Sequence, residues 1–302
     1  MNEASDLVAV WCKEKFASLV TAFFSGRNWR TIQAYRQDLE DFRLFLEADS
    51  INQAAAVLLG LSHGDANAVA LGYKTSLIER KLQAATVNRR LASLRSLVKL
   101  ARTLGLVSWS LEVENIKARA YQDTRGPGRS GYCCLLDEAS KQPGIRATRD
   151  RAILRLLYDL ALRRDSVVTL NMEHVDLEAG SITVLAKGRT SREARTLPPE
   201  TKAALEEWIA SRGAEPGPLF VNFDRAKKGK GRLSGTSIYR IVHQLGRRAG
   251  LSTRPHGLRH AAITEALNLT NGDVRAVARF SGHRKIETLI IVARLVASAA
   301  AL

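Results

Sequence analysis

Two stretches near the end of the chain decide its fold: residues 256–264 read HGLRHAAIT, and residues 280–289 read FSGHRKIETL. They bring His256, Arg259 and His283 into one short part of the sequence. His256 and His260 are four residues apart, which is also the spacing of a zinc-binding pair on a helix. No glutamate follows the first histidine and no third ligand is near. The pattern therefore predicts no metal site, and His260 is expected to be a structural residue that packs or hydrogen-bonds locally.

Two earlier stretches add cations to this set. Residues 156–167 read LLYDLALRRDSV, and Arg163 is predicted to end a helix. Residues 184–199 read VLAKGRTSREARTLPP, and Lys187 is predicted to lie in a short basic turn between two strands. Guanidinium groups suit phosphate because they are planar, always charged and offer a fork of donors. A cation also suits the end of a helix on its own account, and Arg164 is an alternative to its neighbour.

The four stretches, in this order and at these separations, resemble the motif boxes of the tyrosine recombinases, or phage integrases. ATVNRRLASLRSL (85–97) is similar to the family's core-binding domain, so the resemblance covers nearly the whole chain. It implies that Arg163 and Arg259 clamp a scissile DNA phosphate and that Lys187 is the general acid. It implies that His256 and His283 hydrogen-bond the phosphate. It implies no cofactor, because the arginines neutralise charge as metal ions do elsewhere.

Two departures from the family pattern bear on activity. The family usually has an acid three residues after the first arginine; this chain has Ser166 there, with Asp165 one residue earlier. The family's nucleophilic tyrosine lies nine residues after the last histidine, and here that position holds Val292. A valine cannot attack phosphorus. The last tyrosine in the chain is Tyr239, so the sequence predicts either a replaced tyrosine or a local deletion.

Apolar spacing predicts a mainly α-helical chain in two parts. We expect a helical core-binding domain over 1–116, a Gly-containing basic linker over 117–131, and a catalytic-type domain over 132–302. The second domain is expected to be mostly helical with a small antiparallel β-sheet, the DNA breaking–rejoining fold that the resemblance implies. Helices are predicted at 29–46, 85–104, 148–163, 201–211, 237–249, 258–267 and 274–280, and strands at 181–185 and 194–199.

The charge of the chain predicts a nucleic-acid partner. Lys and Arg total 46 against 30 Asp and Glu, a net charge of +16, and residues 81–111 contain no acid. A phosphate-facing helix explains this stretch better than an ordinary surface helix with interleaved acids. The loop at 226–233 is as compatible with a plain surface loop as with DNA contact. The candidate DNA-binding residues are Arg89, Arg90, Arg95, Lys99, Arg102, Lys227, Lys228 and Lys230.

The sequence also predicts where the protein works. No apolar stretch approaches the roughly 18 residues that span a bilayer, and the first residues lack the basic start of a secretory signal. Its three cysteines are too few for a disulfide framework. We therefore expect a soluble cytoplasmic protein with no membrane partner, and we expect Cys133 and Cys134 to be small buried residues.

The function that these patterns favour is site-specific DNA recombination or integration, as in mobile elements. The partner is double-stranded DNA, and the resemblance implies self-association on DNA as a tetramer. A catalytically silent paralogue that occupies or occludes recombination sites is an alternative, favoured by Val292. A topoisomerase would need the same tyrosine. A basic RNA-binding protein of another fold would not explain four ordered boxes.

The net charge of +16 predicts that affinity for duplex DNA falls steeply with salt. Binding several phosphates releases several counterions, so a plot of the logarithm of affinity against the logarithm of salt concentration should have a negative slope of several units. Titrations from about 50 to about 200 mM salt measure this slope. A flat dependence would show that the charge has another purpose.

Overall fold

The structure, a computed structural model, describes residues 18–117, 126–185, 191–223 and 231–282, together with residues 286, 289, 290 and 293. The chain divides into two compact units, Met1–Tyr121 and Gln122–Leu302. The division falls inside the segment predicted to be a linker, 117–131. Helix α6 (Gly128–Ser140) nevertheless begins within that segment. The sequence did not predict this start because the first turn of the helix is polar and carries no apolar periodicity.

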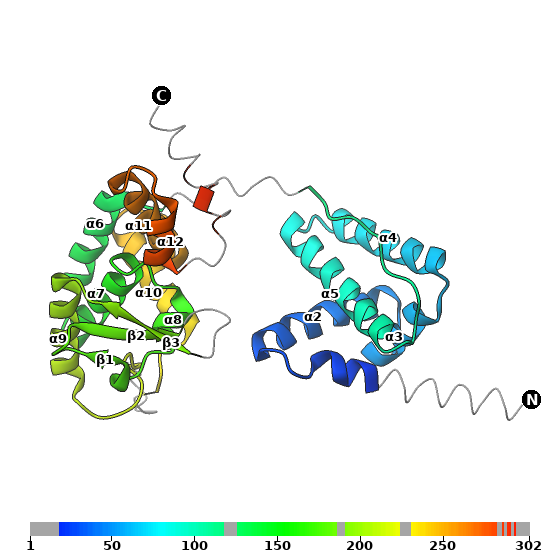
Figure 1. The fold of residues 1–302 in the computed structure, drawn as a ribbon, viewed down its shortest axis with the longest axis horizontal. Coiled ribbons are helices and arrows are strands. Elements are labelled where there is room, and N and C mark those ends of the chain that lie inside the picture. Colours follow the sequence, from blue (N-terminus) through cyan, green and yellow to red (C-terminus); the bar gives the residue numbers. More distant parts are fainter. Residues whose placement is uncertain are drawn as a thin grey trace, which may run out of the picture. The chain divides into compact units, whose positions relative to one another are not determined.

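The N-terminal unit is helical (Figure 1). Residues 18–24 are helical, and α2 (Trp29–Phe45), α3 (Ile51–Gly60), α4 (His63–Glu79) and α5 (Ala84–Thr103) follow them. The helices predicted at 29–46 and 85–104 agree with α2 and α5 to within one residue. Sequence reasoning missed α3 and α4, whose buried faces are rich in alanine. Both begin at serine caps, where Ser50 and Ser62 accept hydrogen bonds from backbone amides.

Aromatic packing holds α2 against α4. The rings of Phe42 and Phe45 on α2 lie with their centroids 5.1 and 5.2 Å from that of Tyr73 on α4. The Tyr73 hydroxyl is satisfied because it donates to Asp41 on α2 at 2.7 Å. Buried aromatic rings of this size supply much of the apolar burial of a small helical unit.

The C-terminal unit combines helices with one small sheet (Figure 1). Helix α7 lies at its centre and packs against α6, α9 and α11. Within the described residues, none of the helices is both long and apolar enough to cross a membrane. The elements are α6 (Gly128–Ser140), α7 (Ile145–Tyr158), α8 (Arg164–Val168), β1 (Val175–Asp176), β2 (Ser181–Leu185), β3 (Arg192–Thr196), α9 (Pro199–Arg212), α10 (Gly235–Arg248), α11 (Pro255–Leu269) and α12 (Val274–Ser281).

The sheet is antiparallel with the order β1-β2-β3. The expected strand at 181–185 is confirmed as β2. The expected returning strand at 194–199 is β3, which pairs Leu185 with Arg192 and Ser181 with Thr196. It ends before the predicted residue because Pro198 and Pro199 have no amide hydrogen to donate to a ladder. Pro199 instead starts α9, where a missing donor costs nothing.

Helix α7 ends earlier than predicted. The expected helix at 148–163 stops at Tyr158, and Ala161 adopts a left-handed conformation with φ 46°. Arg163 is therefore not the last residue of a helix: it is extended and directly precedes α8. The proposal that it complements a helix C-terminus was wrong, because the chain has already left α7 at that point.

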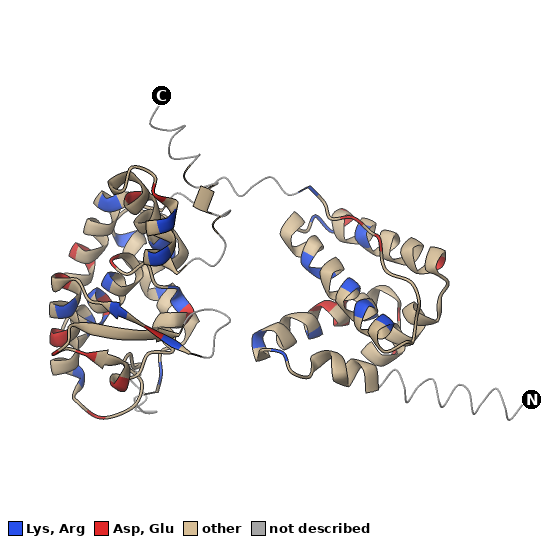
Figure 2. Ribbon diagram, in the orientation of Figure 1, with Lys and Arg blue, Asp and Glu red and all other residues tan. Residues whose placement is uncertain are grey.

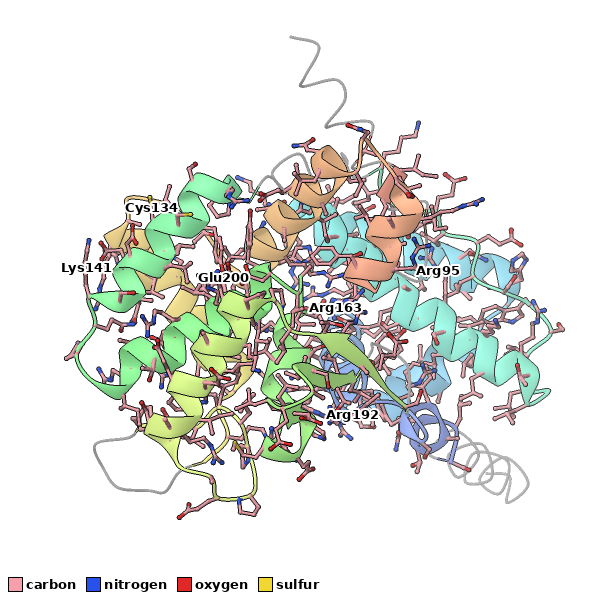
Figure 3. The ribbon with its side chains drawn as sticks, turned by 60° about the vertical axis from the view of Figure 1, so that its left-hand side comes forward. Arg95, Cys134, Lys141, Arg163, Arg192 and Glu200 are labelled. Atoms are coloured by element: carbon pink, nitrogen blue, oxygen red, sulfur yellow. The ribbon has the colours of Figure 1, made fainter. Side chains whose placement is uncertain are left out.

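The cysteines of α6 differ from expectation. Cys133 and Cys134 are both exposed (Cys134 is labelled in Figure 3). The buried face of α6 carries Tyr132, Leu135 and Ala139 at helical spacing, so the residues between the first two point away from the core. The prediction that they are buried was wrong.

Among the residues that the structure describes, Trp208 of α9 is the largest fully buried side chain, and its indole donates to the Leu219 carbonyl at 2.9 Å. Trp208→Ala should lower the free energy of unfolding of the C-terminal unit by about 3–5 kcal/mol, because it opens a cavity and leaves a carbonyl unpaired. Urea titration followed by hydrogen exchange of α7 and α9 amides measures the loss. The matched control is Trp29→Ala, since Trp29 is 64% exposed. Equal effects of the two substitutions would contradict this account.

Candidate active site

The two predicted arginines meet in the C-terminal unit. Arg259, in the first turn of α11, is 3% exposed and donates to the Ala161 carbonyl and, at 2.8 Å, to the Ser281 carbonyl. Arg163 is half-buried, and its Nη2 donates to the Gly282 carbonyl at 3.4 Å (Arg163 is labelled in Figure 3). The turn after α7, the start of α11 and the end of α12 therefore converge on two guanidinium groups.

A third guanidinium, which sequence reasoning missed, belongs to Arg195 on β3. Its Nη1 donates to the carbonyls of Phe280 and, at 2.9 Å, of Arg279, at the end of α12. Arg195 pairs in register with Ile182, whose side chain is fully buried. Paired residues of adjacent strands face the same side of a sheet. The sequence therefore did contain a signal for Arg195: in the expected hairpin, this arginine lies on the same side of the sheet as a buried isoleucine.

The three arginines line one small cavity of about 20 Å³, together with Ser166 and Gly282. That volume has room for about one water molecule. The hydrogen bonds described above all end on backbone carbonyls, which carry partial negative charge but do not neutralise a cation. One carboxylate, that of Glu193, also lines the cavity and lies 3.6 Å from Nη2 of Arg195, so three guanidinium groups and one carboxylate leave the described lining with a net positive charge.

The electrostatics of the site follow from this crowding. Burial, together with the charges of Arg163 and Arg195, lowers the pKa of Arg259 to about 9. Burial and then the charge of Arg195 lower the pKa of Arg163 as well. The cations thus repel one another in a poorly hydrated place. A bound phosphate would relieve this repulsion and restore the pKa values, because an opposite charge favours the ionised form.

The histidines of α11 lie beside this cation cluster. His256 is exposed, and the His256 and His260 rings meet edge to face with centroids 6.3 Å apart. Loss of solvent and then the charges of Arg259, Arg254 and Arg163 lower the pKa of His256. Loss of solvent and then His256 and Arg259 lower the pKa of His260. Among the described residues, no group of three or more His, Cys, Asp or Glu side chains is arranged to hold a metal ion.

Ser166, at the position where an acid was expected from the resemblance, donates to a backbone carbonyl. Its hydroxyl donates to the Leu185 carbonyl at 3.2 Å, at the end of β2, while the Gly282 carbonyl accepts from Arg163. Arg164 lies near Asp165, with Nε 3.6 Å from its carboxylate, and does not line the cavity. Of the two adjacent arginines, Arg163 is therefore the one that the structure brings to the site.

Several predicted site residues lie outside the described residues. They are Lys187, Lys227, Lys228, Lys230, His283 and Val292. Of the five predicted catalytic residues, the structure describes Arg163, His256 and Arg259, which lie near one another. The positions of Lys187 and His283 stay predictions.

Lys and Arg residues lie along α5 (Figure 2), and their exposure and contacts divide the predicted DNA-binding residues into two groups. Arg90 is largely buried and donates to Asp41 at 2.7 Å, and Arg89 pairs with the buried carboxylate of Asp38. Arg95, labelled in Figure 3, donates to the Val113 carbonyl and the Asn115 side chain. The remaining two predicted cations, Lys99 and Arg102, are exposed. Part of the predicted DNA-facing set therefore holds the unit together.

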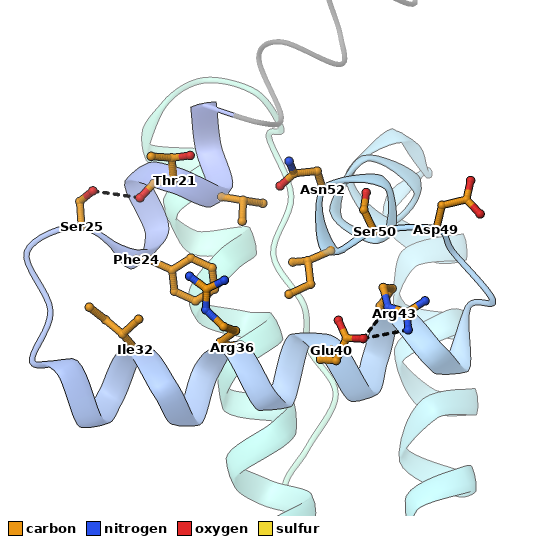
Figure 4. Close-up of a pocket in the computed structure, with 12 residues that line it drawn as sticks. Thr21, Phe24, Ser25, Ile32, Arg36, Glu40, Arg43, Asp49, Ser50 and Asn52 are labelled. Atoms are coloured by element: carbon orange, nitrogen blue, oxygen red, sulfur yellow. Dashed lines mark hydrogen bonds and ion pairs between the residues drawn. The ribbon is translucent and has the colours of Figure 1, made fainter.

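A larger hollow, of about 820 Å³, lies in the N-terminal unit (Figure 4). It is open, and its wall combines apolar side chains with cations that already have neighbours. Arg43 pairs with Glu40 at 2.8 Å, and the Arg36 guanidinium lies 4.9 Å from the Phe24 ring centroid. Size alone therefore does not locate the chemistry: the small cavity holds the clustered guanidinium groups, and the large hollow does not.

Comparison with known proteins bears on both units. The model of the phage integrase family matches residues 134–296, and that of the phage integrase N-terminal SAM-like domain matches residues 25–104. A tyrosine recombinase of Synechocystis sp. is 37% identical over 271 residues, which cover 88% of this chain and 86% of the relative. A tyrosine recombinase XerC of Halalkalibacterium halodurans is 31% identical over 284 residues, covering 85% and 84%.

Solved structures show the same fold at lower identity. XerH recombinase in a post-cleavage complex with a palindromic difH substrate is 19% identical, with a TM-score of 0.65, over 87% of this chain and 76% of that one. A lambda integrase dimer bound to a COC′ core site is 15% identical, with a TM-score of 0.65, over 92% and 95%. The mainly helical fold with a small antiparallel sheet is thus confirmed.

Acid should destabilise the C-terminal unit through its histidines. The pKa values of His256 and His260 are lowered in the folded unit, so the unfolded chain binds more protons once the pH falls below about 6.5. The free energy of unfolding should therefore decrease as the pH is lowered through that range. Urea titrations at about pH 7.5 and about pH 5.5 measure the loss. The double variant His256→Asn, His260→Asn should lose less, and an unchanged loss would refute this cause.

Proposed function

Because the chain belongs to the phage integrase family of tyrosine recombinases, we propose that it is a site-specific recombinase by descent. In this proposal it binds duplex DNA and holds one backbone phosphate between Arg163 and Arg259. Residues 1–116 serve as the core-binding domain, 117–131 as the linker and 132–302 as the catalytic-type domain. The charge of +16 supplies the attraction to the DNA backbone.

The observation that carries this proposal is the pair of arginines held by carbonyls. Arg163 and Arg259 are oriented by the carbonyls of Gly282, Ser281 and Ala161. Because a backbone carbonyl carries only a partial negative charge, orientation by carbonyls preorganises the two guanidinium groups and leaves the site positive. Such a site stabilises the charge that develops on a phosphate under attack, and it needs little rearrangement at that moment.

The other predicted residues complete the chemistry by their positions in the sequence. Lys187 lies between β2 and β3 in the sequence and would give a proton to the leaving 5′-oxygen. His256 is near Arg259 and Arg163, whose charges help to lower its pKa, so its neutral ring can hydrogen-bond the phosphate or accept a proton. His283 directly follows Gly282 and would serve the same phosphate.

The nucleophile is the missing part. Val292 occupies the position expected for tyrosine. In the described part of the C-terminal unit, Tyr132 and Tyr158 are buried and donate to Asp159 and Glu265. Burial raises the pKa of both phenols, which opposes formation of a nucleophilic phenolate. The chain as written therefore binds and holds the phosphate without attacking it.

A silent regulator of recombination sites is the second candidate, and Val292 favours it. Such a protein would occupy or occlude the sites on which an active relative works. In either case we propose self-association on DNA as a tetramer, action in the cytoplasm and an association with mobile elements. The absence of a membrane partner is part of the same proposal.

The test is covalent trapping on a nicked suicide duplex that carries a site selected by the chain from a random pool. The unmodified chain should bind this duplex and give no covalent band on a denaturing gel, because no hydroxyl is placed in line with the leaving oxygen. Val292→Tyr should restore the band. Adding Arg259→Gln should then slow its formation by roughly 10²- to 10³-fold, as loss of one oxyanion donor does.

Val292→Phe is the matched control, because it supplies the ring without the hydroxyl. A covalent band from the unmodified chain that depends on Arg259 would contradict the proposal and would place the nucleophile elsewhere, with Tyr239 or a partner chain as the first candidates. Failure to select any duplex would refute DNA binding itself.

A further inference from the structure

Arg195 is the member of the cation cluster to which the family resemblance assigned no role. It lies on β3, and its side chain is 19% exposed. Its Nη1 donates to two successive carbonyls at the end of α12, those of Arg279 and Phe280. One side chain thus fastens the hairpin to a separate helix 84 residues further along the chain.

The contact with the α12 turn is close. Gly282 has φ 63°, and a Cβ built there would lie 2.9 Å from Nη2 of Arg195. A side chain at position 282 would therefore strain the backbone and push against the guanidinium. The same Nη2 lies 3.6 Å from the Glu193 carboxylate, which directs the group from its own strand.

The turn that Arg195 holds also holds the two predicted clamps. The next two carbonyls, of Ser281 and Gly282, accept from Arg259 and Arg163. A shift of this turn would therefore move both clamps together. Arg195 is also close enough for its charge to lower the pKa of each.

The two segments that Arg195 joins carry further predicted site residues. In the sequence, Lys187 lies between β2 and β3, and His283 follows Gly282 directly. The contact of Arg195 therefore joins the strand that follows Lys187 to the turn that precedes His283. Catalytic constellations depend on such support because small displacements are costly.

We propose that Arg195 is a positioning residue of the phosphate site, which fastens β3 to the α12 turn and so fixes Arg163 and Arg259 in their clamping orientation. The inference rests on the proposed function, since it takes the clamped group to be a DNA phosphate. It predicts energetic coupling between Arg195 and Arg259 in DNA binding, beyond the loss of one charge.

The experiment is a double-mutant cycle on affinity for the selected duplex, with urea midpoints measured first for every variant. Arg259→Gln should weaken binding about 10-fold or more, as loss of a charge-assisted hydrogen bond does. In an Arg195→Gln background the same change should cost less than about twofold, because Arg259 is already misplaced. A cycle with Arg163→Gln tests the second clamp independently, should the buried Arg259 variant fail to fold.

Arg192→Gln is the matched control. Arg192 is on the same strand and carries the same charge, but it donates to the carbonyls of Thr183 and Thr169 and not to the α12 turn. The fold-loss of affinity in the double variant Arg192→Gln, Arg259→Gln should equal the product of the fold-losses of the two single variants. Arg195→Lys separates position from charge, because an ammonium keeps the charge but lacks the rigid fork that spans two carbonyls. In the Arg195→Lys background, as in the Arg195→Gln background, Arg259→Gln should therefore cost less than about twofold in affinity.

The outcomes distinguish this inference from the proposed function. If Arg259→Gln and Arg163→Gln both bind as tightly as the unmodified chain, the phosphate clamp itself is refuted. If both weaken binding but their losses simply multiply with that of Arg195→Gln, the clamp stands and the positioning role is overturned. The positioning role would also be overturned if Arg259→Gln cost its full loss of affinity in the Arg195→Lys background, because the charge at position 195 would then suffice.

Discussion

The carbonyls of residues 279–282, at the end of α12, are the constraint on which the site depends. Arg195, Arg259 and Arg163 come from a strand, a helix and an extended segment, and all three donate to this one turn. The C-terminal end of a helix carries partial negative charge, so it attracts cations without fully neutralising them. A carboxylate in the same place would hold the arginines more firmly but would compete with phosphate for their donors.

This arrangement requires an exact frame around it. Buried cations are costly, and removing a partner from one leaves a charge without compensation. The frame is the apolar core around α7, and Ala161, in its left-handed turn after that helix, offers the carbonyl that accepts from Arg259. The strained turn and the early end of α7 thus serve the site. Without them Arg163 would continue a helix and would not enter the cavity.

The sequence predicted the elements whose signals are local. Period-3.6 apolar stripes gave α2 and α5, alternation gave β2, and ordered motifs gave Arg163 and Arg259. It did not predict α3 and α4, whose alanine-rich faces form no contrasting stripe, nor the end of α7, which depends on a left-handed alanine. Arg195 was missed because its role comes from a contact with residues 84 positions away. Exposure of Cys133 follows from α6 periodicity, which the glycines at its start obscured.

The net charge of the chain is not equally available to a ligand in its two units. In the N-terminal unit, hydrogen bonds from Arg80 and Tyr73 outweigh burial and lower the pKa of Asp41, which also pairs with Arg90. These ion pairs join α2, α4 and α5, so part of the acid-free stretch of α5 meets acids from other helices. Acids remote in sequence are invisible to a count along the helix. In the C-terminal cavity the three arginines donate to backbone carbonyls, and Glu193, which lies 3.6 Å from Arg195, is the one carboxylate in the described lining. The charge that can act on a phosphate is therefore concentrated where guanidinium groups outnumber carboxylates.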